Sequence, residues 1–195
     1  MKKYLLSVLL GIVSLSVWAK GDIDPKYGVG AIVTNENGKV YFQQSFPIPS
    51  GMTQDQCYEL MLNWAKGRFA QPFVQAGRVL TENAQSRRFV FHADQTITFK
   101  RTGLVADESR IEYNFSVAVG DNSVTATMTD IKYRYEEGRE GGGQLLNAEE
   151  WITDEEAFNA KKTRFLKRTG KFRIKTIDLK DSLFDSISQT VAGSR

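Results

Sequence analysis

The stretch from Gly77 to Tyr135 constrains the fold most, because its apolar residues recur at every second position. Between Ile111 and Val119 the alternation is unbroken, and polar or small residues fill the intervening positions. A period of two places alternate side chains on opposite faces of a β-strand. Strands with one apolar and one polar face are typical of an antiparallel sheet that is covered on one side only. The segment therefore predicts an antiparallel meander with one face open to solvent.

Two interruptions of this alternation predict β-bulges. One lies within residues 93–95, where the strand expected over residues 87–101 becomes polar. The other lies near Asp130, where the apolar positions change from even to odd numbers: Val124, Ala126, Met128, Ile131, Tyr133 and Tyr135. An extra residue in one strand produces such a slip of the pattern by one position.

Residues before the meander predict a hairpin and a helix. Asn37 and Gly38 separate two apolar runs, and this dipeptide tolerates the positive φ of a tight turn. Thr53 with Gln56 forms a capping box at the start of a helix that ends before Pro72. Its apolar stripe, at helical spacing, comprises Cys57, Leu60, Met61, Trp64 and Ala65.

The residues after the meander predict a loop and two more helices. Residues 136–147 are rich in glycine and are expected to form a loop. A helix is expected from a capping box of Thr153 and Glu156 to the basic residues near position 168, with Gly170 following its end. Residues 171–191 fit a helical pattern, although residues 171–177 also alternate as a strand would; length favours the helix.

The order of these elements predicts an α+β fold of two layers, with helices packed on one face of an antiparallel sheet. Residues 28–135 would form the sheet and first helix, and residues 148–195 a helical segment on the same domain. Residues 20–27 are short and polar, and we expect them to be a flexible lead. A hydrophobic content of 41% is sufficient for a core.

The first nineteen residues have the pattern of a secretory signal peptide. Lys2 and Lys3 precede an apolar run that ends at Val17-Trp18-Ala19, so cleavage is expected after Ala19. A membrane anchor is the alternative, but a spanning helix needs about 20 apolar residues and this run is shorter. We therefore expect a periplasmic or secreted protein.

Cysteine usage and charge exclude several classes for the mature chain. The single cysteine, Cys57, allows no intrachain disulfide, and its distance from the cleavage site excludes a lipoprotein. Loss of Lys2 and Lys3 lowers the formal net charge from +3 to +1. A nearly neutral chain is not a general nucleic-acid binder by composition, since such proteins show a strong basic excess.

Several segments resemble a known family. They are GKVYFQQSFPIP, TQDQCYELMLNWAKGRF, the strands that end at IKYRY, and the tail AEEWITDEEAFNAKK with GKFRIKTIDLKDSLF. These residues are similar to an exported Gram-negative domain of unknown function with a TBP-like (TATA-binding-protein-like) fold, over roughly residues 38–135 and the tail. The resemblance implies a curved antiparallel sheet with helices on one face. It implies no activity, no site residues and no DNA binding.

Candidate catalytic and cofactor residues are few. His92, the only histidine, could act as a general base near Asp94 or could be a strand-surface residue, and one histidine argues against a histidine-based metal site. Cys57 lies on an apolar helix stripe, where a cysteine behaves as a small hydrophobe. Residues 138–143 lack the Lys-Ser/Thr of a phosphate-binding loop. We therefore expect no metal and no cofactor.

Residues 161–175 contain eight basic residues and no acidic one. They could contact anionic lipid headgroups, lipopolysaccharide phosphates or an acidic partner. Alternatively, they complement a helix C-terminus and the acidic residues on either side. The residues proposed for this basic patch are Lys161, Lys162, Arg164, Lys167 and Arg168.

The polar face of the predicted meander is the other candidate surface. It could bind an extended peptide, a glycan or an envelope protein, or it could be an ordinary solvated face. The residues proposed for this face are Lys100, Glu112, Asn114, Thr125 and Thr127. The sequence thus favours a non-catalytic periplasmic binding or accessory domain. The alternatives are association with a membrane surface or anionic partner through residues 161–175, and an enzyme that uses carboxylates such as Glu112 or Asp130.

Overall fold

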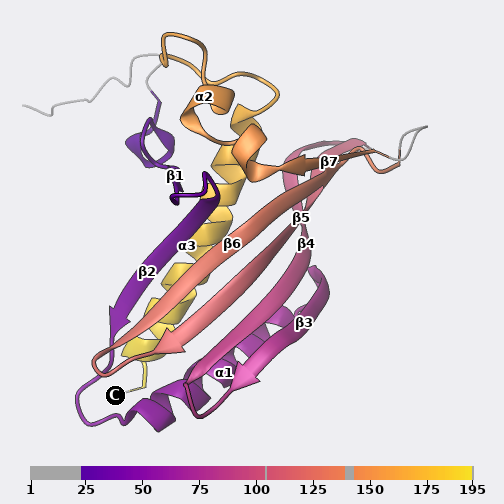
Figure 1. Ribbon diagram of the computed structural model, residues 1–195. Helices are drawn as coiled ribbons and strands as arrows, with labels where there is room; N and C mark the ends of the chain where they lie inside the picture. Colours follow the sequence, from indigo (N-terminus) through magenta and orange to yellow (C-terminus); the bar gives the residue numbers. More distant parts are fainter. Residues whose placement is uncertain (1–22, 104, 139–142, 195) are drawn as a thin grey trace, which may run out of the picture.

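The computed structural model describes residues 23–103, 105–138 and 143–194, and the predicted signal peptide lies outside these ranges. Its centre is a seven-stranded antiparallel sheet with the order β1-β2-β6-β5-β4-β3, and β7 also pairs with β6 (Figure 1). The strands are β1 (Val33–Thr34), β2 (Val40–Pro47), β3 (Val74–Asn83), β4 (Arg88–Thr102), β5 (Val105–Val119), β6 (Ser123–Tyr135) and β7 (Gln144–Asn147).

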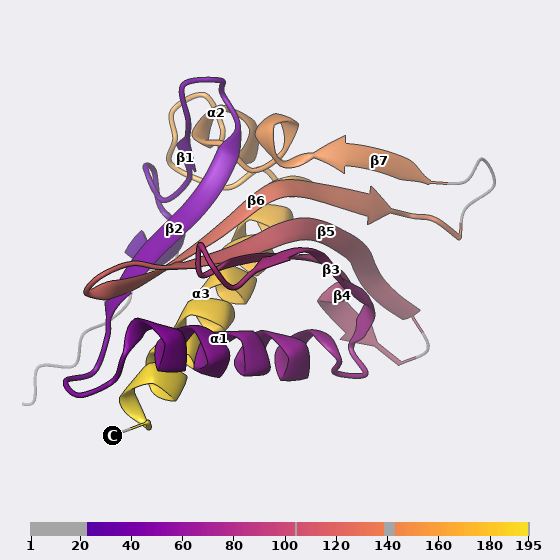
Figure 2. The ribbon, with the colours of Figure 1, turned by 60° about the horizontal axis from the view of Figure 1, so that its bottom comes forward.

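Two long helices cover one face of this sheet. α1 (Gln54–Phe69) and α3 (Gly170–Ala192) lie on the same side, and in the described part of the chain no helix of comparable length lies on the opposite face (Figures 1 and 2). The indole nitrogen of Trp64 on α1 donates to the hydroxyl of Ser186 on α3 at 2.9 Å, which joins the two helices. The predicted two-layer α+β arrangement is confirmed. Within the described residues, no helix is long and apolar enough to cross a membrane.

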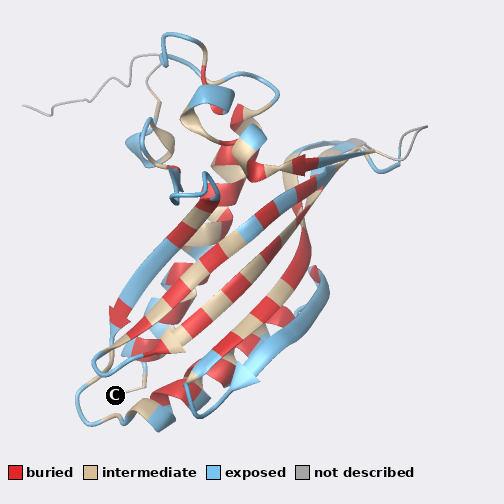
Figure 3. Ribbon diagram, viewed as in Figure 1, coloured by how far each residue is buried: buried red, intermediate tan, exposed pale blue. Residues whose placement is uncertain are grey.

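The core lies between the sheet and these helices. Buried and partly exposed residues alternate along β4, β5 and β6, as the period of two predicts (Figure 3). The rings of Phe69 on α1 and Phe91 on β4 stack with centroids 5.2 Å apart. Phe172 on α3 is fully buried and packs edge-on against Tyr133. Because aromatic side chains bury large areas, these contacts fix both helices to the sheet.

The bulge expected near Asp130 is confirmed. Asn114 pairs with Thr129 while Glu112 pairs with Lys132, so β6 contains one residue more than β5 at this point. Asp130 adopts a positive φ of 52°, which an aspartate tolerates better than most residues. The apolar side chains on both sides of the bulge therefore face the core.

The irregularity expected within residues 93–95 lies instead on the neighbouring strand. The register between β3 and β4 shifts at Gln75, between Val74 and Ala76, while β4 pairs continuously with β5 there. The buried polar residues of β4, Asp94 and Gln95, each have a side-chain partner that explains them. The amide oxygen of Gln95 accepts a hydrogen bond from the phenol of Tyr113 at 3.3 Å. Polar residues that interrupt an apolar pattern need no bulge when a partner satisfies them.

The start and end of α1 agree with the prediction. Thr53 Oγ1 accepts from the amide of Gln56 at 3.2 Å, and Gln56 Oε1 accepts from the amide of Thr53 at 2.8 Å, which completes the capping box. The helix ends at Phe69, before Pro72. Cys57 is fully buried within it, and burial raises the pKa of its thiol.

The helix predicted from Thr153 to residue 168 was wrong. Only Asp154–Ala157 (α2) is helical, and Gly170 begins α3 instead of following a helix. Asn159 explains the break, because its side-chain oxygen accepts from two amides across a turn, those of Thr163 at 2.9 Å and Arg164 at 3.0 Å. A local bond of this kind competes with helix formation. The preference for a helix over residues 171–191 is confirmed.

The segments expected to be loose also contain regular structure. The range 136–147 includes β7 in addition to loop residues, and residues 139–142 lie outside the described part of the chain. The expected lead contains a short 3₁₀-helix (Pro25–Tyr27, η1). Lys26 forms ion pairs of 2.9 Å with both Asp178 and Asp181 on α3. A second 3₁₀-helix (Ala148–Glu150, η2) follows β7.

Alkaline pH is expected to destabilise this core. Burial raises the pKa of the phenols of Tyr113 and Tyr133 above its ordinary value of about 10. Both phenols therefore keep their protons in the folded state at a pH where the unfolded chain has lost them. Stability is fully present below about pH 10 and should fall above it, by up to about 1.4 kcal/mol per pH unit for each tyrosine.

Urea denaturation at pH 8, 10.5 and 11 checks this expectation. The free energy of unfolding should decrease across the series, and the decrease should be shallower in a Tyr133→Phe variant. Equal stability at pH 8 and pH 11 would contradict the assignment of these two phenols.

Candidate binding face

The face of the sheet that turns away from α1 and α3, here called the open face, carries polar side chains. Four of the five predicted residues belong to it by strand alternation: Glu112, Asn114, Thr125 and Thr127. Lys100 lies apart from them, beyond a register shift in β4 and opposite Asp107. The carboxylate of Asp107 on β5 binds Lys171 of α3, so the paired ends of β4 and β5 at Lys100 and Asp107 lie close to the helix layer.

A hollow of about 710 Å³, here called the trough, runs over one end of the open face. The middle strand, β5, carries the small residues Ser116 and Ala118 there. Its neighbours carry longer side chains, such as Arg88 opposite Ala118 on β4. This difference in length leaves the space above β5. The residues that line it are Gln43, Thr81, Ser86, Arg88, Phe89, Val90, Ser116, Val117, Ala118, Val119, Gly120, Ser123, Thr125 and Thr127.

Hydrogen bonds order one wall of the trough. Gln43 of β2 donates from Nε2 to Thr127 Oγ1 of β6 at 3.0 Å. Beside this pair, the hydroxyls of Ser45 and Thr125 lie 2.9 Å apart. Cross-strand pairs of this type fix side-chain rotamers on a sheet face. The polar groups of this wall are therefore held in place before any ligand binds.

A chain of three polar residues crosses the open face next to the trough. Asn114 donates from Nδ2 to Asp130 at 2.7 Å, so its Oδ1 turns toward His92 Nδ1, 3.1 Å away. Because an amide oxygen only accepts, His92 carries its proton on Nδ1. His92 is thus paired with Asn114, and Asp94 is engaged elsewhere. The structure does not bring His92 and Asp94 together as a catalytic pair.

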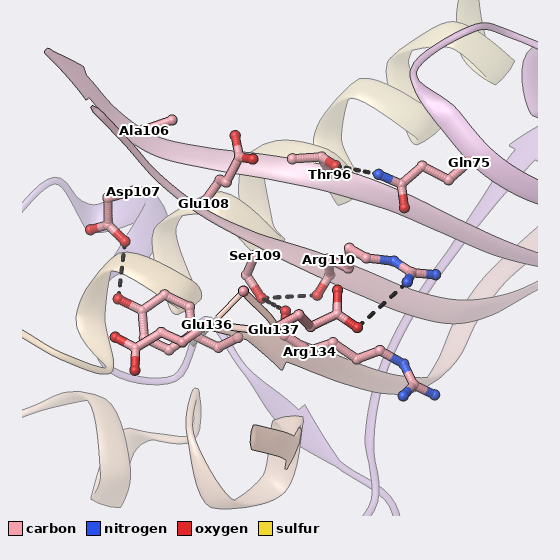
Figure 4. A pocket seen from close by; sticks show the side chains of 12 residues that line it. Gln75, Thr96, Ala106, Asp107, Glu108, Ser109, Arg110, Arg134, Glu136 and Glu137 are labelled. Atoms are coloured by element: carbon pink, nitrogen blue, oxygen red, sulfur yellow. Dashed lines mark hydrogen bonds and ion pairs between the residues drawn. The ribbon is translucent and has the colours of Figure 1, made fainter. Parts of the chain in front are cut away.

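Beyond this chain the open face is charged, and a second hollow of about 520 Å³ lies there (Figure 4). Arg110 donates to Asp94, from Nε at 3.0 Å, and forms an ion pair of 3.5 Å with Glu137. Arg134 pairs with Glu112. The hydrogen bonds to Asp94 and to Glu112 raise the pKa of Arg110 and Arg134 respectively. Their positive charges are therefore largely neutralised within the protein.

The carboxylates considered for catalysis are part of these networks. Glu112 accepts from Arg134, and Asp130 accepts from Asn114. No group of three or more His, Cys, Asp or Glu residues that could hold a metal occurs in the described ranges.

The basic residues of positions 161–175 do not form one patch. Arg173 is fully buried, and Lys171 pairs with Asp107. Lys162 pairs with Glu155 at 3.0 Å, and Arg168 lies over the ring of Trp151. Three of the five proposed residues are exposed and have no ion pair, side-chain hydrogen bond or ring contact among the described residues: Lys161, Arg164 and Lys167.

The sequence interpretation missed the trough. Ala118 and Arg88 occupy open-face positions, but their significance depends on which strands are neighbours. The alternation of small Ser116 and Ala118 with apolar residues was the available signal. Only the pairing of β5 with β4 and β6 shows that larger side chains flank them.

A curved antiparallel sheet with two helices on one face defines a TBP-like protein of the α+β class. Residues 42–134 match the family described as "Domain of unknown function (DUF4468) with TBP-like fold". The family resemblance and the fold that it implies are thereby confirmed.

Solved structures agree with this assignment. A DUF4468 family protein from Bacteroides ovatus is similar with a TM-score of 0.77 and 28% identity, covering 85% of this chain and 93% of that chain. A TBP-like protein from Parabacteroides distasonis has a TM-score of 0.65 at 19% identity, covering 81% of this chain and 96% of that chain, which supports the fold alone. A comparison with curated proteins gives no significant match.

Proposed function

We propose that this protein is an exported, non-catalytic binding domain of the periplasm, and that its open face holds the ligand. The trough is the observation that carries the proposal. Its volume of about 710 Å³ falls within the roughly 300–1,000 Å³ typical of small-molecule sites. Since α1 and α3 already cover the other face, the open face is the side of the sheet left for a ligand.

The chemistry of the open face supports binding over catalysis. A general acid or base needs a titratable group that can exchange a proton with the substrate. Asp94 and Glu112 are held by arginines. His92 bonds through Nδ1 to the neutral amide of Asn114 and has no carboxylate partner among the described residues to support it as a base. The trough itself is lined by hydroxyl, amide and apolar groups with one arginine. Such groups orient a ligand through hydrogen bonds, which supports a binding role.

Export is the second part of the proposal. It rests on Lys2 and Lys3, the apolar run that follows and the small residue Ala19 at the expected cleavage site. Lys20 would then be the first residue of the mature protein, a few residues before η1, which is fixed to α3 through Lys26.

Filling the trough tests the binding proposal. An Ala118→Trp variant places a large side chain over β5, where tryptophan has a favourable β-propensity. The low-molecular-weight fraction of an envelope extract should raise the melting temperature of the wild type but not that of Ala118→Trp. Lys132→Trp is the matched control, because Lys132 lies on the same face outside both hollows. An equal response of wild type and Ala118→Trp would contradict the proposal.

A second candidate function is contact with an anionic surface through residues 161–167. It is favoured by three unpaired cations, Lys161, Arg164 and Lys167, and by Leu166, which is 40% exposed. Unpaired basic residues around an exposed leucine suit a membrane of negative surface charge. Co-sedimentation with phosphatidylglycerol vesicles separates this candidate from the first, because it should be lost on replacing the three cations with glutamine and unaffected by Ala118→Trp.

A further inference from the structure

We infer that the trough binds a short acidic saccharide, with a carboxylate of the sugar at Arg88 and its hydroxyl groups along Gln43, Ser116 and Thr127. The inference rests on the proposed function and gives the chemical class of its ligand. It follows from the charge of the trough, from the kind of polar groups that line it, and from the backbone beneath it.

Arg88 is the one charged residue among those that line the trough. Within the described residues its guanidinium has no ion pair or hydrogen bond to another side chain. Two other arginines differ: the adjacent Arg87 pairs with Asp55 at 2.6 Å, and Arg110, in the second hollow, pairs with Asp94. An unpaired guanidinium beside a hollow attracts an anion, and its planar fork matches a carboxylate through two parallel hydrogen bonds.

The other polar groups of the trough match the hydroxyls of a sugar. Serine and threonine hydroxyls both donate and accept, as does a glutamine amide, and a sugar hydroxyl needs the same two capacities from its site. The Gln43–Thr127 pair holds this wall in a fixed conformation. Val90 and Ala118 supply apolar surface for the C–H groups of a sugar ring. A rigid polar wall lowers the entropic cost of ordering side chains on binding.

The backbone beneath the trough argues against an extended peptide. β4, β5 and β6, which form the floor of the trough, are interior strands that are paired on both sides. Their main-chain groups are therefore used within the sheet. The edge strand β3 contributes only Thr81, at the margin of the trough. Peptides that bind sheets gain most of their affinity from free main-chain groups at an edge strand. A saccharide needs only side-chain partners, and these are what the trough offers.

Isothermal titration calorimetry with defined probes tests the inference. The probes are the trimers of galacturonate and mannuronate, the methyl ester of the galacturonate trimer, neutral maltotriose, and a triglutamate peptide. We expect at least one uronate trimer to bind the wild type. Esterification, which removes the carboxylate charge without changing the protein, should weaken binding at least tenfold.

Variants locate the binding. Arg88→Gln should lower the affinity for the uronate trimer at least tenfold. Lys132→Gln, which removes one positive charge elsewhere on the open face, should change this affinity less than twofold. Failure of both trimers to bind, equal binding of the neutral or esterified probe, tighter binding of triglutamate, or an equal loss in Lys132→Gln would each overturn the inference.

The two proposals fail in distinguishable ways. If no uronate trimer binds but the envelope extract still stabilises the wild type and not Ala118→Trp, the binding function stands and the acidic-saccharide assignment falls. If the extract stabilises neither protein, the binding function falls as well.

Discussion

An Arg173→Met variant should lose about 3–5 kcal/mol of unfolding free energy. The Arg173 side chain is fully buried on α3. Its guanidinium donates to the carbonyls of Tyr27 and Ile152, both at 2.8 Å, and to that of Gly28. It also forms an ion pair of 2.8 Å with Asp154. Methionine fills a similar volume but leaves three carbonyls and a mostly buried carboxylate without this donor.

Urea denaturation of purified variants measures the loss. Arg164→Met is the matched control, because Arg164 is exposed in the loop and has no ion pair in the described structure; its change should stay within about 0.5 kcal/mol. The loss of unfolding free energy in Arg173→Lys should fall between the other two, since lysine keeps the charge but lacks the planar guanidinium with its several N–H donors. A loss below about 1 kcal/mol in Arg173→Met would show that this cluster does not hold the N-terminal segment in place.

Gly77→Ala should destabilise the protein by about 3 kcal/mol, at the upper end of the usual cost of overpacking. Gly77 lies on β3 where the C-terminus of α1 approaches the strand. A Cβ added there would overlap the carbonyl oxygen of Phe69 and lie 3.0 Å from its Cβ. A backbone atom cannot move aside as a flexible side chain can, so α1 would have to shift away from the sheet.

Gly67→Ala is the matched control for this prediction. Gly67 lies in α1, and a Cβ added there has no atom within 4 Å. Alanine favours helix over glycine, so this variant should gain about 0.5–1 kcal/mol. Opposite signs in thermal unfolding would confirm the close approach of α1 to β3. Equal stability of Gly77→Ala and the wild type would contradict it.

The sequence predicted the elements whose signals are local. The alternation from Ile111 to Val119 and the capping box of Thr53 each specify a strand or a helix through nearby residues alone. The slip at Asp130 was predictable for the same reason. These elements make up most of the sheet and one of its two covering helices, which is why the fold class could be predicted.

The remaining features depend on contacts between distant segments. Thr153 and Glu156 match a capping box, yet Asn159 forms its own turn and ends the helix after Ala157. In the sequence Arg173 belongs to a basic run. In the structure its guanidinium donates to the carbonyls of Tyr27, Gly28 and Ile152, which are distant in sequence. The side chains around Ser116 are likewise set by strand pairing. Sequence spacing alone does not give these neighbours.

Chemical-shift mapping tests most directly whether the open face is the binding surface. The ¹⁵N-labelled protein would be titrated with the envelope fraction that raises its melting temperature. We expect the amides of β4, β5 and β6 around Arg88, Ser116, Ala118 and Thr127 to shift, and we expect these shifts to be absent in Ala118→Trp. Shifts confined to the loop of residues 158–169, or to the helix layer of α1 and α3, would contradict it.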